Sequence, residues 1–436
     1  MLAFTTLEAE LESRWPENRL EPTLDRIVAL LDSVGNPHRV VPTIHITGTN
    51  GKSTTARMID ELLRAHGLRT GRYTSPHLES VRERIVVEGD SVDPHLFVEI
   101  HGELAPHIRT MDASGSVPLS FFEIMTAIGL TAFARVGVDV AIVEVGMGGT
   151  WDATNVIDGR VCVITPISLD HVDYLGPDEV AIAAEKSGIV KFGSTLVTGP
   201  QLKAVTDVLT ARADDMRAAV VHVDRIVRIV ERLQHPDRQL LHLATAEQDY
   251  PDIELAIAGR HQAENACTAV AAVEAFLAGD GDALEPRRVR QAFARVTAPG
   301  RLEPVGANPT TVIDVSHNPA GMTVTAAAFE EAYPDGRTVV VLAVLGDKDI
   351  DGILRALMPL AWRIVLTENE SPRRLPAHRL ADRARAIVPG EMLHEEPDYG
   401  AAVDYARALA REAGAGANVL VTGSVVTAGQ ARALLT

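Results

Sequence analysis

The sequence predicts an α/β protein in which a larger domain is followed by a smaller one. Short apolar, β-branched runs alternate with helical segments along most of the chain, which is typical of parallel sheets covered on both faces. The stretch 222–258 differs, because alternating runs flank a turn there and predict a small antiparallel subdomain. Proline and glycine lie close together at 296–304 and mark a boundary, so we assign residues 1–297 to the first domain and residues 298–436 to the second.

The predicted elements of the first domain begin with two helices, the second over residues 24–33. Residues 41–47 are β-branched and alternate, which predicts a strand. Residues 52–66 carry apolar side chains on one side, which predicts a helix that ends at Gly67. Compact apolar runs predict further strands at 139–145, 161–167 and 194–199, and a helix is predicted over 261–278.

The second domain repeats the alternation of strands and helices and predicts a Rossmann-like α/β unit. Its strands are predicted at 311–315, 338–345, 363–367 and 418–422, and its helices near 320–332, 350–360, 376–388 and 399–413.

The composition is that of an ordinary globular protein, with 436 residues, 46% of them hydrophobic and 23% charged. A formal net charge of −18 argues against binding to nucleic acid or to an anionic membrane surface. Cys162 and Cys267 lie far apart, which gives neither a disulfide framework nor a metal motif. The uncharged run 413–431 is interrupted by glycines, and the first residues lack the features of a signal peptide. We therefore expect a cytoplasmic protein that does not span a membrane.

A glycine-rich stretch, Ile-His-Ile-Thr-Gly-Thr-Asn-Gly-Lys-Ser-Thr at 44–54, joins the first predicted strand to the helix after it. Backbone N–H groups and the helix dipole attract an anion at such a junction, and Lys52 adds a full positive charge for the β- and γ-phosphates of a nucleotide. Ser53 or Thr54 can reach Mg²⁺. The usual phosphate-loop pattern has a glycine where this chain has Ile46. The predicted nucleotide contacts are Gly48, Thr49, Asn50, Gly51, Lys52, Ser53 and Thr54.

Polar residues also follow several other predicted strands. Glu144 ends a strand before a glycine-rich turn, and a carboxylate there can hold a hard cation beside the phosphates. Asp170 and His171 follow the next strand, and Asp314 follows the first strand of the second domain. Each feature also has an ordinary explanation, since a strand-end glutamate can have a structural partner and a histidine is more often packed than bound to metal. The residues alone leave both explanations open.

Ten segments, taken in order, resemble the Mur ligase superfamily and cover nearly the whole chain. Within the superfamily, Thr-Gly-Thr-Asn-Gly-Lys is similar to the folate branch, which contains the dihydrofolate and folylpolyglutamate synthases. Four positions depart from the family pattern, namely Ser53 in place of a glycine, Thr150 in place of an arginine, and the pair Val315-Ser316 before His317. The ten segments are TGTNGK (47–52), YTSPHLESVRERI (73–85), VEVGMGGTWDATN (143–155), PISLDHVDYLG (166–176), AEKSGIVK (184–191), GRHQAENA (259–266), PGRLE (299–303), VIDVSHNPAG (312–321), LGDKD (345–349) and TGSVVTAG (422–429).

The resemblance implies a Mur-ligase-like central domain with a phosphate loop and two Mg²⁺ ions. The implied metal ligands are Ser53, Ser75, Glu144, His171 and Lys186, the last as a carbamate formed with CO₂. ATP would also contact Asn265, Arg301 and Asp314, and the implied catalytic residues are Lys52, Lys186, Arg301 and His317. The pterin substrate would contact Asp152, Ala153 and Thr154, and we add Ser120, Phe121, Phe122 and Glu123 as candidates for the same pocket. The segment 21–27 is a further candidate, and the alternative for 118–127 is an apolar helix start packed in the core.

The implied reaction is ATP-dependent amide formation through an acyl phosphate. L-Glutamate would be added to dihydropteroate and to the γ-carboxylate of reduced folates, by a monomer that acts on small molecules only. Addition to folates alone remains an alternative. A ligase acting on peptidoglycan precursors is disfavoured because only about 40 residues precede the first strand. A phosphate-loop protein without ligase chemistry is disfavoured by Glu144, His171 and Lys186.

Overall fold

The computed structural model describes residues 2–14, 22–115, 117–278, 283–334 and 336–436. In this part of the chain the residues cluster into two compact units. The first contains residues 1–230, 243–251 and 264–293, and the second contains residues 231–242, 252–263 and 294–436. Each unit is α/β, as predicted. The chain passes between the units several times before residue 294, and the predicted domain boundary at 297/298 stays a prediction.

An eight-stranded sheet, counted over the described residues, forms the centre of the first unit, with the order β4-β3-β2-β5-β1-β6-β7-β8. The strands β2, β5, β1, β6, β7 and β8 are parallel to one another. At one edge of the sheet, β3 pairs antiparallel with β2, and β4 pairs antiparallel with β3. Strands β1 and β5 are buried along their whole length, which explains the apolar run Val140–Val143 of β5. The strands are β1 (Thr43–Thr47), β2 (Thr70–Tyr73), β3 (Ile85–Val87), β4 (Asp90–Ser91), β5 (Val140–Glu144), β6 (Gly159–Ile164), β7 (Thr195–Thr198) and β8 (Ala219–His222).

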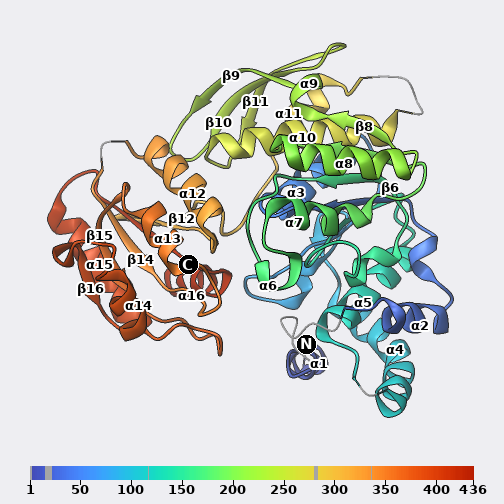
Figure 1. Ribbon diagram of the computed structural model, residues 1–436, viewed down its shortest axis with the longest axis horizontal. Helices are drawn as coiled ribbons and strands as arrows, with labels where there is room; N and C mark the ends of the chain where they lie inside the picture. Colours follow the sequence, from blue (N-terminus) through green and yellow to red (C-terminus); the bar gives the residue numbers. More distant parts are fainter. Residues whose placement is uncertain (1, 15–21, 116, 279–282, 335) are drawn as a thin grey trace. The chain divides into compact units, whose positions relative to one another are not determined.

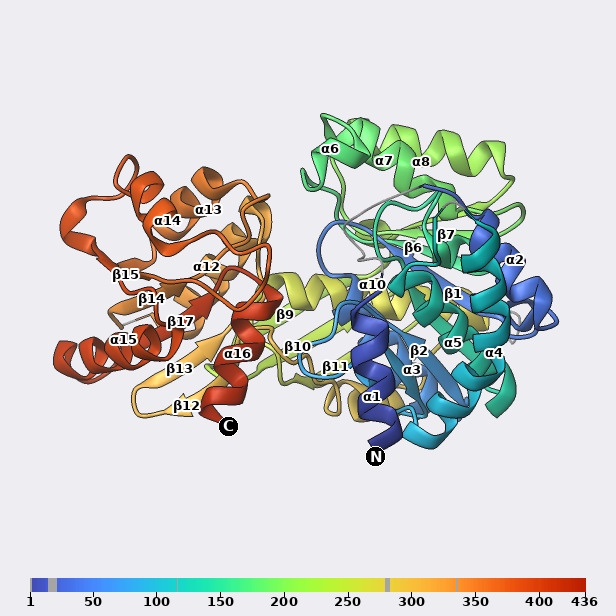
Figure 2. The ribbon, with the colours of Figure 1, turned by 90° about the horizontal axis from the view of Figure 1, so that it is seen from below.

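Helices cover this sheet and supply its cores. Helix α3 packs against β1, β2 and β5, and α5 packs against α2 and α4. One core joins α1, α2, α4 and α5 to β2 and β5, and another joins α7 and α8 to β6 and β7. Figure 2 shows α4 and α5 side by side and α7 beside α8. The helices are α1 (Leu2–Glu12), α2 (Asp25–Ser33), α3 (Lys52–Ala65), α4 (Pro94–Ser114), α5 (Phe121–Val136), α6 (Val172–Leu175), α7 (Glu179–Lys186), α8 (Lys203–Asp215), α9 (Val223–Ile226), α10 (Arg260–Leu277) and α11 (Pro286–Phe293).

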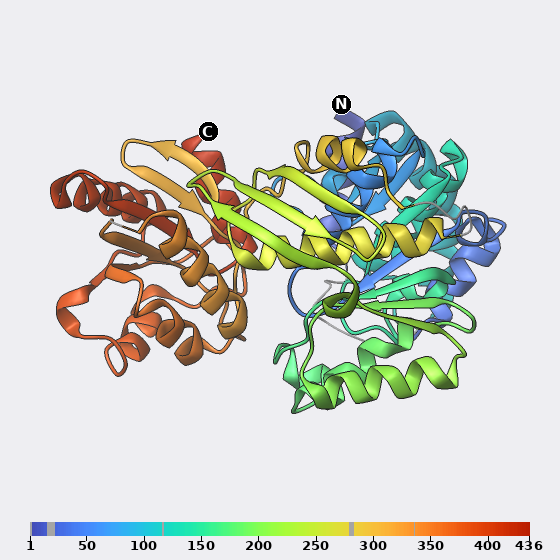
Figure 3. The same ribbon diagram turned by 90° about the horizontal axis from the view of Figure 1, so that it is seen from above.

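The predicted antiparallel subdomain is a three-stranded sheet of β9 (Arg228–Gln234), β10 (Gln239–Ala244) and β11 (Asp249–Leu255) (Figure 3). Tight turns connect the strands, closed by His235 N–H to the Arg238 carbonyl and by Thr245 N–H to the Gln248 carbonyl. The prediction placed the start of this subdomain too early, at residue 222. His222 ends β8 of the large sheet, and the next four residues form α9, because a short helical turn links the two sheets there.

The second unit contains a sheet of order β12-β13-β17-β14-β15-β16, six strands over the residues described there. Neighbouring strands in this sheet are parallel, except that β12 pairs antiparallel with β13. Figure 2 shows α12, α13 and α14 on one face of the sheet and α15 and α16 on the other. The elements are β12 (Glu303–Ala307), β13 (Thr310–Ile313), β14 (Thr338–Leu342), β15 (Ala361–Leu366), β16 (Leu393–Glu395), β17 (Asn418–Thr422), α12 (Pro319–Ala332), α13 (Ile350–Leu357), α14 (Ala377–Ala384), α15 (Tyr399–Ala413) and α16 (Val425–Leu435).

Across the described residues, no helix has both the length and the apolar composition needed to cross a bilayer. The uncharged run 413–431 contains the end of α15, the strand β17 and the start of α16, as the sequence analysis predicted.

Candidate active site

The glycine-rich loop lies between β1 and α3, and two of its glycines cannot be replaced without a clash. Gly48 has φ 146° and Gly51 has φ 88°, both in the region that favours glycine. A Cβ atom at Gly48 would lie 1.9 Å from Oγ1 of Thr165, and one at Gly51 would lie 2.6 Å from Oδ1 of Asn265. The close approach also brings Asn265, a predicted nucleotide contact more than 200 positions away in the sequence, against the loop.

Hydrogen bonds anchor the loop to the segments that follow the neighbouring strands. The Thr49 hydroxyl donates to the Ser168 carbonyl at 2.9 Å, and the Thr47 hydroxyl donates to the Gly148 carbonyl at 2.8 Å. The Lys52 ammonium lies over the loop and donates to the carbonyls of Gly48 and Thr49 at 3.1 Å. The carboxyl ends of parallel strands meet at one edge of a sheet, and ligands of open α/β sheets bind at this edge.

Glu144, at the end of β5, accepts hydrogen bonds from two other segments of the first unit. The Ser53 hydroxyl donates to Oε1 at 2.9 Å, and the Ser75 backbone N–H donates to Oε2 at 3.2 Å. Glu144 is 1% exposed. A buried carboxylate with two serines beside it offers oxygen ligands, which suit a hard cation such as Mg²⁺. The described residues hold no group of three or more His, Cys, Asp and Glu suited to a metal.

Lys186 is the last residue of α7 and is 4% exposed. Burial is the main cause that lowers the pKa of Lys186 to about 7. The positive charge of Lys52 acts in the same direction, and the charges of Asp170, Asp152 and Glu185 act in the opposite direction. Because the charge of Lys52 acts on Lys186, Lys186 lies close to the phosphate-loop lysine. A substantial fraction of its amine is therefore neutral near pH 7, which is the form that can react with CO₂.

His171 is the N-cap of α6 and has a left-handed backbone conformation, with φ 51°. Its backbone N–H donates to Asp170 at 2.9 Å, and its side chain is 29% exposed. Because the charge of Asp170 acts on Lys186, the turn that carries His171 lies on the same side of the unit as Lys186.

The three predicted pterin contacts at 152–154 are all buried. Asp152 accepts from the N–H of Met147 at 2.9 Å and from the N–H of Thr154 at 2.9 Å, and burial raises its pKa. The Thr154 hydroxyl bridges Asp152 and Nε2 of His45, at 2.5 and 2.9 Å. Sequence reasoning missed His45, which lies in the middle of the fully buried strand β1. Burial lowers the pKa of His45 to about 3, so its ring is neutral.

The other pterin candidates, at the start of α5, serve mainly structural contacts. Ser120 and Glu123 form a capping box, and Glu123 also accepts from Nε of Arg26 at 3.0 Å. Phe121 is buried under the guanidinium of Arg84. Phe122 is half-buried, and its ring packs against Gly146. A Cβ atom at Gly146 would lie 2.5 Å from this ring. Phe122 therefore lies next to the glycine-rich turn after β5. Glu21, the first residue of the candidate segment 21–27, lies outside the described residues.

In the second unit, Asp314 follows β13 and is buried. It accepts from the N–H of Leu302 at 3.1 Å, from the N–H of Ser316 at 2.9 Å and from the Thr325 hydroxyl at 3.0 Å. Arg301 directly precedes Leu302, so Asp314 holds the turn that carries Arg301.

Two histidines of the second unit lie near this turn. Nδ1 of His317 contacts the Val315 carbonyl at 3.0 Å. The charges of Asp314 and Arg301 both act on His261, and burial lowers the pKa of His261 to about 4. His261 is a second residue that sequence reasoning missed, although the segment 259–266 that contains it was identified.

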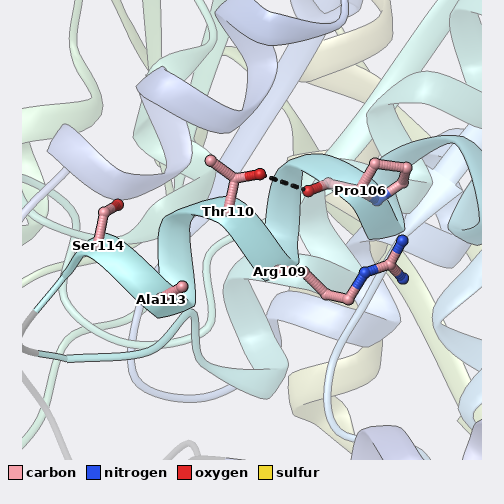
Figure 4. Close-up of a pocket in the computed structure, with 5 residues that line it drawn as sticks. All are labelled: Pro106, Arg109, Thr110, Ala113 and Ser114. Atoms are coloured by element: carbon pink, nitrogen blue, oxygen red, sulfur yellow. Dashed lines mark hydrogen bonds between the residues drawn. The ribbon is translucent and has the colours of Figure 1, made fainter.

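A large surface hollow, of about 580 Å³, lies on α4 (Figure 4). Its lining residues, Pro106, Arg109, Thr110, Ala113 and Ser114, include none of the predicted site residues. Another hollow, of about 410 Å³, adjoins the turn 150–155 and the end of α7.

Comparisons with known proteins agree with these motifs. The model of the Mur ligase middle domain matches residues 46–273, and that of the Mur ligase glutamate ligase domain matches residues 300–425. A Mycobacterium tuberculosis protein named dihydrofolate synthase/folylpolyglutamate synthase is 44% identical, over 98% of this chain and 93% of its own length. A Bacillus subtilis protein of the same name is 29% identical, over 94% and 95% of the two chains.

Solved structures extend the similarity to the whole fold. Mycobacterium tuberculosis folylpolyglutamate synthase complexed with ADP has a TM-score of 0.94 and 43% identity, and the match covers 100% of this chain and 98% of that one. E. coli FolC in complex with DHPP and ADP has a TM-score of 0.85 and 28% identity, covering 99% and 97%. The chain therefore belongs to the Mur ligase superfamily, in the folate branch of dihydrofolate and folylpolyglutamate synthases.

Proposed function

We propose that this protein is an ATP-dependent ligase that joins L-glutamate to dihydropteroate and to the γ-carboxylate of reduced folates. The observation that carries the proposal is the arrangement around Glu144, where the phosphate loop, through Ser53, and the Ser75 segment share one buried carboxylate. The Mycobacterium tuberculosis relative, 44% identical over almost the whole of both chains, is named for both activities.

The phosphate loop would bind the β- and γ-phosphates of ATP. Phosphoryl transfer depends mainly on positioning and charge neutralisation, and the loop N–H groups and Lys52 supply both. In the second unit, Arg301 would contact phosphate and Asp314 would accept from the ribose hydroxyls. Asn265, held against Gly51, would contact the nucleotide from the start of α10.

Two Mg²⁺ ions would be held by Ser53, Ser75, Glu144 and His171, with the carbamate of Lys186 as a further oxygen ligand. The oxygen-rich donor set fits this metal. When bound, the ions neutralise charge on the phosphates. The pKa of Lys186, lowered to about 7, supports the carbamate, because a lysine at its ordinary pKa would be almost fully protonated and unreactive towards CO₂.

The chemistry proceeds in two steps without a covalent enzyme intermediate. A carboxylate oxygen of the pterin substrate attacks the γ-phosphorus of ATP, which gives an acyl phosphate and ADP. The amine of L-glutamate then attacks the acyl carbon, and inorganic phosphate leaves with the pair of electrons from the broken C–O bond. Lys52 and His317 would stabilise the negative charge on the transferred phosphoryl group.

The pterin substrate would bind along Asp152, Ala153 and Thr154, with the ring of Phe122 beside it. A second candidate is a folylpolyglutamate synthase without the dihydropteroate activity. This candidate is favoured by a Lacticaseibacillus casei relative named folylpolyglutamate synthase, 33% identical over 82% of this chain and 84% of its own. We further propose that the protein acts as a monomer in the cytoplasm, which sedimentation of the purified protein and fractionation of cells would test.

One assay separates these possibilities. Purified protein with ATP and Mg²⁺ receives L-glutamate and one acceptor, either dihydropteroate, tetrahydrofolate or a peptidoglycan precursor, and both ADP and the mass of the product are measured. We expect ADP release and a product heavier by one glutamyl unit with both pterin acceptors. A product with tetrahydrofolate only would support the second candidate, and turnover with the peptidoglycan precursor only would overturn the proposal.

A further inference from the structure

A hollow of about 410 Å³ in the first unit is lined by two cationic side chains and is separate from the residues assigned to ATP. Its walls come from three segments, which are the turn after β5, the end of α7 with the residues after it, and α8. Helices α7 and α8 lie side by side (Figure 1). The lining residues are Thr150, Asn155, Ala184, Ser187, Gly188, Lys191 and Arg212.

The two cations have backbone carbonyls as their hydrogen-bond partners. The Lys191 ammonium donates to the Asn155 carbonyl at 3.0 Å, and the Arg212 guanidinium donates to the Val190 carbonyl at 3.2 Å. Neither forms an ion pair with an acidic side chain among the residues that the structure describes. An ammonium has three donors and a guanidinium has five, so both retain donors for a ligand. Such a pair is notable in a protein with a net charge of −18.

The positive charge of Arg212 acts on Lys191. Burial is the main cause that lowers the pKa of Lys191, and the charge of Arg212 lowers it too, while the exposed Asp158 and the Cys162 thiol act in the opposite direction. Two like charges that share a partly buried hollow repel each other, and an anion between them would relieve this repulsion.

The walls are held in place without a ligand. Asn155 donates from its side-chain amide to the carbonyls of Thr150 and Gly188, at 2.9 and 3.3 Å. The Thr150 hydroxyl donates to the Glu185 carbonyl at 3.0 Å. A binding site whose walls are already fixed loses little conformational entropy when a ligand binds.

We propose that this hollow is a binding site for a small oxyanion, a phosphate or a carboxylate group held between Lys191 and Arg212. The hydrogen-bond donors that both side chains retain suit such a group. The site adjoins Lys186, which directly precedes the wall residues Ser187 and Gly188. The inference goes beyond the proposed function and does not depend on it, because binding is measured without turnover.

Calorimetric titration of inorganic phosphate, and separately of succinate, tests the proposal at low ionic strength, where screening is weak. The protein is first saturated with Mg²⁺ and a β,γ-methylene analogue of ATP, so that the phosphate loop is already filled. We expect saturable binding of one anion per chain. Binding of phosphate alone, of succinate alone or of both identifies the accepted group.

Lys191→Met and Arg212→Gln should each weaken binding by at least about tenfold, because each removes a charged hydrogen-bond donor. Lys203→Met removes an exposed lysine at the start of α8 and should leave binding unchanged. Arg212→Lys retains the charge and should retain most of the binding, which covers the case in which Arg212→Gln does not fold. The proposal is overturned if neither anion binds saturably, or if the folded Lys191 and Arg212 variants bind as tightly as the unchanged protein.

Discussion

The strand-end carboxylates of the two units, Glu144 and Asp314, are both buried but have different partners. Glu144 accepts from two segments, through Ser53 and Ser75, that lie 91 and 69 positions away. Asp314 accepts from residues at most 12 positions away, on the turn and helix beside it. Glu144 thus joins distant segments of the first unit, whereas Asp314 stabilises a local turn. We infer that the charge of a bound ligand, such as a cation, is compensated mainly around Glu144. Asp314 mainly fixes the conformation of the turn beside it.

The largest expected effect is that of Glu144→Gln. The change removes the negative charge that the proposed Mg²⁺ site requires, so kcat/KM should fall at least about 100-fold, and more Mg²⁺ should be needed for half-maximal activity. Steady-state assays over a range of Mg²⁺ concentrations measure both. Asp90→Asn, on the exposed strand β4, is the control and should behave like the unchanged protein. Unchanged Mg²⁺ dependence in Glu144→Gln would show that this carboxylate is not a metal ligand.

Lys186→Ala should lose most of its activity, because the proposed carbamate ligand cannot form. A small carboxylate such as acetate should restore part of the activity by occupying the vacated space. Turnover with and without added acetate is the measurement, and Lys203→Ala on α8 is the control. Full activity in Lys186→Ala would refute the carbamate role.

The pH dependence of stability should also reveal the buried amine of Lys186. Its pKa is about 7 in the folded protein and near 10.5 when unfolded, so between these values the unfolded chain binds more protons. Stability from this group therefore rises with pH across that window, with a slope approaching about 1.4 kcal/mol per pH unit. Urea unfolding without Mg²⁺ or CO₂ should show that Lys186→Met lacks this rise. An equal rise in both proteins would contradict the lowered pKa.

Asp314→Asn should have a smaller effect on activity and a clear effect on stability. The amide can present one oxygen to Ser316 and Thr325, but its NH₂ group would then face the N–H of Leu302. We expect a loss of about 1–3 kcal/mol in unfolding free energy and a raised KM for ATP. Thermal unfolding and ATP kinetics test this, with Asp347→Asn on an exposed loop as the control. A fall in activity as large as that of Glu144→Gln, with stability unchanged, would reverse the comparison.

Ser53→Gly, which restores the family residue, should have the smallest effect. It removes the 2.9 Å hydrogen bond to Glu144 and leaves the carboxylate in place. A single hydrogen bond to a charged group contributes about 1.5–3 kcal/mol at most, and Mg²⁺ or water can replace it, so kcat/KM should change by less than about tenfold. The same steady-state assay measures kcat/KM of Ser53→Gly. A fall in kcat/KM as large as that of Glu144→Gln would show that the Ser53 hydroxyl is an essential ligand.

Local patterns predicted much of the fold. The apolar runs that became β5, β6 and β7 and the one-sided pattern of α3 depend on neighbours in sequence, so they were identified with small errors in their ends. The short edge strands β4 and β16 were not predicted, because two or three residues carry too little periodicity. The helix α9 was taken for part of an antiparallel strand, since four residues cannot show a helical period.

The substrate-side residues show the limit of such reasoning most clearly. Phe121 and Glu123 suggested a stacking surface with a polar contact. In the structure, Phe121 packs under Arg84, and Glu123 caps its helix and pairs with Arg26. The sequence could suggest the capping box from Ser120 and Glu123, but the partners 97 positions away in sequence, such as Arg26, could not be predicted.

By itself, the sequence determined the strand–loop–helix unit that carries Lys52, the order of the motifs and hence the family, because these are written in residues close together in the chain. Only the tertiary structure decided that Ser53 and Ser75 meet one carboxylate, that Asn265 lies against Gly51, and that Lys186 has a pKa near 7. The physical reason is that desolvation and hydrogen bonding depend on which distant segments pack together, and burial around a side chain is not encoded by its neighbours in sequence.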